Sequence, residues 1–188
     1  MTPALSWPAV MDEWVKGRIW WIRAPLVLLL AQQFWLRSSD AESSGVFSPL
    51  TLGLHELGHL LFGPFGMWIS VAGGSIVQVA APLASAAMFL RQPDYFAIAV
   101  CGGWFGDSLF DMAFYMSDAS TLERDVVTIG GQEPIVPNDW NYLLGSVGLL
   151  LWDQRLAAAV RLCASAIYLA STIYGAIVVW RIASAPRD

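Results

Sequence analysis

Met67 to Leu90 reads MWISVAGGSIVQVAAPLASAAMFL, and none of these 24 residues is charged. An α-helix needs about 20 consecutive apolar residues to cross the hydrocarbon core of a bilayer, whereas shorter apolar runs are typical of buried core helices. The stretch therefore predicts a membrane-spanning helix. Pro82 is expected to kink this helix, and Gly73 and Gly74 would let a neighbouring helix approach closely.

The composition of the whole chain is that of a membrane protein. Of its 188 residues, 56% are hydrophobic and 13% are charged, whereas soluble domains carry about 25% charged residues. Ten Lys and Arg against 15 Asp and Glu give a net charge of −5, which argues against nucleic acid as a partner. We expect a single integral membrane domain, residues 1–188, in contact with the lipid bilayer.

Long apolar stretches outside 67–90 predict further helices. Spans are predicted at 18–36, 67–90, 95–116 and 156–180, because only helices and closed barrels satisfy backbone polar groups in lipid. Two shorter segments, 46–62 and 142–152, either cross or remain re-entrant. The expected fold is therefore an all-α polytopic transmembrane helix bundle of about four to six spans.

The remaining segments predict the borders and orientation of the bundle. Residues 1–17 have apolar residues at helical spacing opposite Asp12 and Glu13, which favours a helix lying in the membrane interface. Residues 117–140 contain five acids and one base and form an acidic extramembrane loop. With four crossings, six Lys and Arg lie on the side of both termini and three on the other. This bias predicts a bacterial inner-membrane protein with both termini on the cytoplasmic side. A fifth crossing by 46–62 would nearly remove this bias.

Both histidines of the chain lie in the motif His55-Glu56-Leu57-Gly58-His59. Residues four apart share one face of a helix, so two imidazoles can reach one zinc ion. The glutamate beside the first histidine is then placed to take a proton from water as a general base. An ionised Glu56 is costly in an apolar helix, which favours a functional role. The alternative is a polar cluster with a purely structural role.

The motif resembles a known family. HELGHLL in an apolar helix is similar to the zinc-binding helix of the site-2 protease family of intramembrane metalloproteases. The wider string HELGHLLFGPFG…AGGSIVQVAAPL also resembles small bacterial membrane proteins related to that family. The resemblance covers residues 50 to about 83 and implies His55 and His59 as zinc ligands and Glu56 as the general base.

The family completes its zinc site with an aspartate of a Leu-Asp-Gly motif in a later helix, and this chain has no such motif. Asp107 and Asp111 lie one turn apart in the predicted span 95–116, where a carboxylate is costly unless it is functional or paired. Asp111 is therefore our first choice for the third ligand and Asp107 our second, with Asp139 the candidate if the HELGH helix opens to the outer face. Alternatively, Asp107 and Asp111 pair with Arg161 or cap backbone groups.

Two functions are compatible with these features. The first is a zinc-dependent intramembrane metalloprotease acting on a membrane protein substrate, with Glu56 as the catalytic residue. The second is a non-catalytic structural subunit of a larger respiratory or photosynthetic membrane complex, built on a protease-like scaffold. Ten tryptophans and the small-residue spacing of Gly102 and Gly106 suit contacts with partner subunits.

Overall fold

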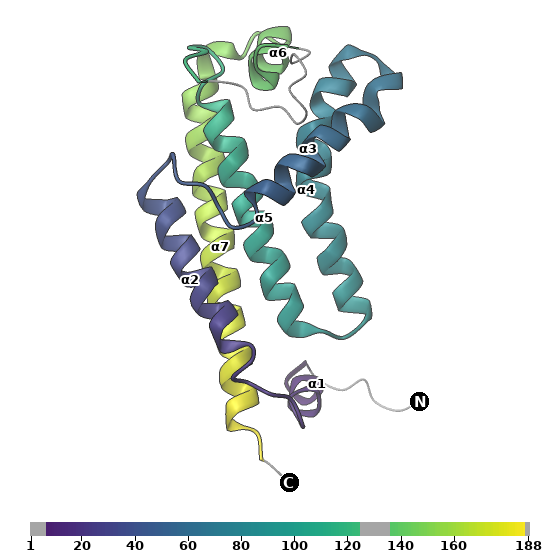
Figure 1. Cartoon of the computed structure of the whole chain (residues 1–188), viewed down its shortest axis with the longest axis vertical. Coiled ribbons are helices and arrows are strands. Elements are labelled where there is room, and N and C mark those ends of the chain that lie inside the picture. The colour runs from purple at the N-terminus through teal and green to yellow at the C-terminus, as the bar shows by residue number, and fades with distance from the viewer. Residues whose placement is uncertain (1–6, 125–135, 187–188) are drawn as a thin grey trace.

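The computed structural model describes residues 7–124 and 136–186, and all regular elements in these ranges are helices (Figure 1). The all-α prediction is confirmed for this part of the chain. The elements are α1 (Trp7–Trp14), α2 (Ala24–Ser39), α3 (Ser48–Phe62), the 3₁₀ helix η1 (Gly63–Phe65), α4 (Met67–Arg91), α5 (Tyr95–Met116), α6 (Asp139–Ser146), the 3₁₀ helix η3 (Leu150–Trp152) and α7 (Asp153–Ser184).

Three long helices form the body of the fold. α5 contacts both α4 and α7 along its length, and α2 packs against α7 and α5 (Figure 1). The helices predicted at 67–90 and 95–116 have nearly the bounds of α4 and α5. The first predicted span, 18–36, starts too early, because α2 begins at Ala24 with a proline in its first turn, a position that proline favours.

Within the described residues, two helices are long and apolar enough to cross a membrane, judged by length and composition: Met67–Arg91 and the continuous segment Leu150–Ser184. Only 28% of the residues in the most apolar window of each helix are buried, so these helices differ from the mostly buried core helix of a soluble protein. α2 has 16 residues, fewer than the roughly 20 that a span needs. The number of crossings and the orientation remain predictions.

The small residues of α5 serve contacts within the chain. A Cβ added to Gly102 would lie 2.2 Å from Ser171 Oγ, and one added to Gly106 would lie 2.9 Å from Tyr168 Cβ. Both neighbours belong to α7. The spacing that we expected to suit partner subunits thus lets α5 and α7 approach each other closely.

α1 lies across the end of the bundle, within the predicted amphipathic segment 1–17. Met11 and Trp14 are buried against Tyr95 of α5 and Val178 of α7, and the Trp14 indole donates a hydrogen bond to Pro93 O. The two acidic residues of α1 are exposed. The helix therefore has the predicted apolar and polar faces, and its apolar face packs on the protein.

The acidic segment 117–140 is partly outside the described residues, which omit 125–135. At its start, Asp118 is buried and accepts hydrogen bonds from the Thr121 hydroxyl and from the backbone N–H groups of Glu123 and Arg124. At its end, Asp139 already belongs to α6. α6 lies at the end of the bundle opposite α1 (Figure 1).

Candidate metal centre

α3 and α4 form a hairpin whose backbones touch at glycines. A Cβ on Gly58 would lie 2.2 Å from Gly73 O, and one on Gly73 would lie 2.7 Å from Gly58 O, so a side chain at either position would collide with the other helix. Gly66, with φ 96°, ends the turn between the helices in a conformation that favours glycine. The hairpin therefore places the HELGH face of α3 directly against α4.

His55 and His59 lie beside each other on this face, with ring centroids 4.7 Å apart. Gly74 of α4 lies under both rings, and a Cβ added there would be 2.7 Å from the Nε2 atoms of His55 and His59. The absence of a side chain at position 74 thus makes the space in which the two Nε2 atoms meet.

The carboxylate that reaches these atoms belongs to Asp139. Its Oδ2 lies 2.9 Å from His55 Nε2 and 3.2 Å from His59 Nε2. Asp139 is the first residue of α6. Within the described residues, His55, His59 and Asp139 are the one group of three metal-ligating side chains whose ligand atoms all lie within 4.8 Å of one another.

α6 is held in place from both ends. Before its first turn, the Asn138 side chain caps the helix by accepting hydrogen bonds from two backbone N–H groups, and its amide donates to Tyr115 O of α5. At the other end, the Trp68 indole of α4 donates to Ser146 Oγ over 2.9 Å. Leu143 is buried against Val71 of α4. These contacts fix the position of the Asp139 carboxylate relative to α4.

The other nitrogen of each imidazole also has a partner. Gln78 Nε2 donates to Ser108 O over 2.7 Å, so Gln78 Oε1 is the acceptor that faces His55 Nδ1 at 2.9 Å. His59 Nδ1 lies 3.0 Å from Ser70 O, and a carbonyl oxygen only accepts hydrogen bonds. Both Nδ1 atoms therefore carry hydrogen, which leaves the Nε2 lone pairs directed at the carboxylate.

Two lone pairs and a carboxylate oxygen repel one another unless a proton or a cation lies between them. The hydrogen bond to Asp139 raises the pKa of His59 above its ordinary value, although burial opposes this. Burial pushes the pKa of Asp139 upward, but the hydrogen bonds with His55 and His59 outweigh it, so the pKa of Asp139 lies below its ordinary value. The three groups thus favour a shared positive charge at their centre.

The donor set fits a zinc ion. Catalytic zinc sites use three protein ligands of imidazole and carboxylate type and keep a further position open. With bonds of about 2.0–2.2 Å, ligand atoms around a tetrahedral ion lie roughly 3.3–3.6 Å apart. Asp139 Oδ2 lies 2.9 Å from His55 Nε2 and 3.2 Å from His59 Nε2, so these two separations need to widen only slightly to admit a zinc ion.

Glu56, the predicted general base, lies next to His55 in the same helix. It is half-buried, and its charge contributes to the raised pKa of His59. Among residues 7–124 and 136–186, it has no hydrogen-bond or ion-pair partner. Its charge therefore acts on His59 of the candidate centre, and its carboxylate is not engaged by the described part of the protein.

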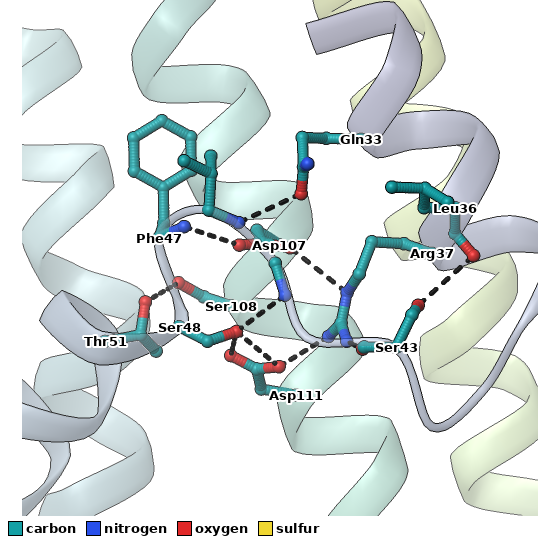
Figure 2. A network of polar contacts seen from close by, with 12 residues as sticks. Gln33, Leu36, Arg37, Ser43, Phe47, Ser48, Thr51, Asp107, Ser108 and Asp111 are labelled. Atoms are coloured by element: carbon teal, nitrogen blue, oxygen red, sulfur yellow. Dashed lines mark hydrogen bonds and ion pairs between the residues drawn. The ribbon is translucent and has the colours of Figure 1, made fainter. Parts of the chain in front are cut away.

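Asp111, our first choice for the third ligand, lies elsewhere. Arg37 Nη2 is 2.5 Å from Asp111 Oδ1, and the Ser48 hydroxyl donates to Asp111 Oδ2 over 3.0 Å (Figure 2). The carboxylate is thus used in an ion pair that joins α2 and α5. The structure thus places Asp111 in this ion pair, and the carboxylate that it brings to the histidines is that of Asp139.

Asp107, the second choice, belongs to the same buried cluster as Asp111 (Figure 2). Arg37 Nε lies 3.1 Å from Asp107 Oδ1, in an ion pair that lacks the alignment of a hydrogen bond, and Phe47 N–H donates to Asp107 Oδ2. Pairing with arginine was predicted, but the partner is Arg37. Arg161 donates to the Arg37 carbonyl over 2.7 Å instead.

Sequence reasoning missed the outer partners of the histidines. Gln78 is the one side-chain amide in the uncharged stretch 67–90, and it is buried. A buried amide is costly unless it is hydrogen-bonded, so its isolation in an apolar helix was a usable signal. Ser70 contributes a backbone carbonyl, and no sequence signal marks such a contact.

Comparisons with known proteins identify no relative of this chain. No protein-family model, curated protein or solved structure matches the chain.

Proposed function

We propose that this chain is a zinc-dependent peptidase that cleaves membrane proteins within or next to the bilayer. The observation that carries the proposal is the meeting of His55, His59 and Asp139, which come from two helices far apart in the sequence. The resemblance of HELGH to the zinc-binding helix of site-2 proteases points to the same reaction.

His55, His59 and Asp139 would hold the metal through two Nε2 atoms and one carboxylate oxygen. When bound, zinc supplies Lewis-acid chemistry by polarising a peptide carbonyl and making water more acidic. Gln78 and Ser70 fix the orientation and tautomer of the imidazoles through their Nδ1 atoms, as outer partners commonly do in metal sites.

Glu56 would act as the general base. Its carboxylate accepts a proton from the water that attacks the peptide carbonyl, and it then returns that proton to the leaving amine. The lack of another partner for Glu56 among the described residues suits this role, because a carboxylate held in an ion pair is a weaker base.

The experiment compares wild type with Glu56→Gln. Both proteins are purified and assayed for cleavage of membrane-spanning peptides and for zinc content. We expect Glu56→Gln to lose about 10²–10⁴-fold in cleavage rate, the usual cost of removing a general base, and to keep its zinc. Glu42→Gln is the matched control, because Glu42 is exposed in the loop between α2 and α3.

The same experiment tests the alternative function. Absence of cleavage in both wild type and Glu56→Gln, with an unchanged yield of any co-purifying membrane complex, would rule out the peptidase and favour a non-catalytic structural subunit. Replacing a carboxylate by an amide would then be tolerated, because the neutral group is cheaper to bury.

A further inference from the structure

A groove of about 600 Å³ lies at the end of the bundle opposite the candidate metal centre. Its lining residues come from the segment before α2 and the start of α2, from the end of α4 and from the start of α5, at the end of the bundle where α1 lies (Figure 1). Its volume falls in the range of roughly 300–1,000 Å³ that is typical of small-molecule sites. The residues that define its chemistry are Arg18, Ile22, Arg23, Leu26, Phe89 and Val100.

The two arginines give the groove its charge. Neither forms an ion pair with a residue in 7–124 or 136–186. Arg18 Nε donates to Trp14 O over 2.7 Å and its guanidinium lies 3.9 Å from the Trp14 ring centre, while Arg23 Nη1 donates to Ile19 O. These contacts hold both guanidinium groups beside the groove and leave further N–H donors for a ligand.

One acid also lines the groove, but its role is local. Asp94 Oδ1 accepts the backbone N–H of Ala97 and so caps the start of α5. Two arginines and one aspartate leave the groove with a formal charge of +1. An anionic ligand group is therefore favoured near the arginines.

The rest of the lining is apolar. Ile22 lies just before α2 and Leu26 lies in its first turn, and they are 52% and 43% exposed. Phe89 of α4 and Val100 of α5 also line the groove. A lining that combines two arginines with an apolar wall matches a molecule with an anionic head and a hydrocarbon chain. A free phosphate ion would leave this wall uncovered.

We propose that this groove binds an anionic phospholipid. The phosphate lies between Arg18 and Arg23, where guanidinium groups form charge-assisted hydrogen bonds with it. One acyl chain lies along Ile22, Leu26 and Val100. Basic pockets between helices at the membrane surface recognise anionic head groups by the same physical means. The site is independent of the proposed peptidase activity, because it lies at the other end of the bundle.

The test is native mass spectrometry of the full chain in detergent, titrated with phosphatidylglycerol or with phosphatidylcholine of the same acyl chains. We expect phosphatidylglycerol to bind more tightly. We expect Arg23→Gln to weaken that binding about fivefold and Arg18→Gln/Arg23→Gln about 25-fold, given the usual contribution of each basic residue at an anionic surface. Arg91→Gln is the matched control, because Arg91 is exposed at the same end and does not line the groove.

A second variant tests the apolar wall without changing the charge. Leu26→Trp enlarges a half-exposed residue of the groove and is expected to weaken phosphatidylglycerol binding while helical content stays the same. Equal binding of the two lipids, full binding by Arg18→Gln/Arg23→Gln, or an equal loss in Arg91→Gln would each overturn the proposal. The Leu26→Trp and Arg23→Gln variants keep the test decisive if the double variant does not fold.

Discussion

Asp139 Oδ2 lies 2.9 Å from His55 Nε2, although the two residues are 84 positions apart in the sequence. This contact joins the first residue of α6 to the middle of α3. At the candidate centre, a carboxylate from α6 therefore faces two imidazoles from α3.

Asp139→Asn should lower zinc affinity more than the loss of an outer partner such as Gln78. It removes a ligand oxygen, so the loss should exceed the roughly 10–100-fold cost of removing an outer partner. Zinc content after purification and calorimetric titration measure the effect. Asp111→Asn is the comparison variant, and it should keep zinc binding. Loss of zinc binding in Asp111→Asn together with normal zinc binding in Asp139→Asn would instead identify Asp111 as the ligand.

Gln78→Leu should weaken zinc binding about 10–100-fold, because His55 loses the acceptor that fixes its ring and tautomer. The same titration measures this change. Gln32→Leu, an exposed position on α2, makes the same substitution away from the centre and should have no effect. Unchanged affinity in Gln78→Leu would show that the His55–Gln78 contact does not position the imidazole.

Gly74→Ala should prevent zinc binding, because its Cβ would lie 2.7 Å from both Nε2 atoms and displace the rings. Gly53→Ala is the control on α3, since a Cβ there meets nothing within 4 Å. We expect that control to bind zinc and to stabilise the helix by about 0.5–1 kcal/mol. Normal zinc binding by Gly74→Ala would contradict the observed geometry.

Arg37→Gln should destabilise the fold by about 3–5 kcal/mol, because it leaves buried carboxylates without their counter-charge. Unfolding of the purified chain in denaturing detergent measures the change. Adding Asp107→Asn should recover part of the loss by removing one uncompensated charge. Arg155→Gln, at an exposed position, serves as the control. An unchanged unfolding midpoint for Arg37→Gln would mean that the ion pairs contribute no net stability.

Single cysteines test the orientation predicted from the Lys and Arg distribution. Ser120, just after α5, and Ser184, at the end of α7, are both exposed. The end of α5 and the end of α7 lie towards opposite ends of the bundle (Figure 1). With the termini inside, Ser120→Cys should be labelled from the outer face of sealed membranes and Ser184→Cys from the cytoplasmic face. Labelling of Ser120→Cys from the cytoplasm would reverse the predicted orientation.

The sequence alone determined two of the long helices and the placement of the histidines on one of the helix faces. The uncharged run 67–90 and the apolar run 95–116 are helices with nearly the predicted bounds. The spacing of His55 and His59 was likewise sufficient to place both imidazoles on one helix face. These inferences succeed because helix formation and helix periodicity depend on residues within a few positions of each other.

Only the tertiary structure decided which carboxylate faces the histidines. Asp107 and Asp111 were reasonable candidates, since a buried charge must be paired or functional, but that rule does not distinguish a metal from an arginine. The distinction depends on how α2 and α6 pack against other helices. Arg37 of α2 reaches both aspartates of α5, while α6 packs on α4 and presents Asp139 to α3. Such contacts join residues far apart in the chain, and no periodic pattern in the sequence records them.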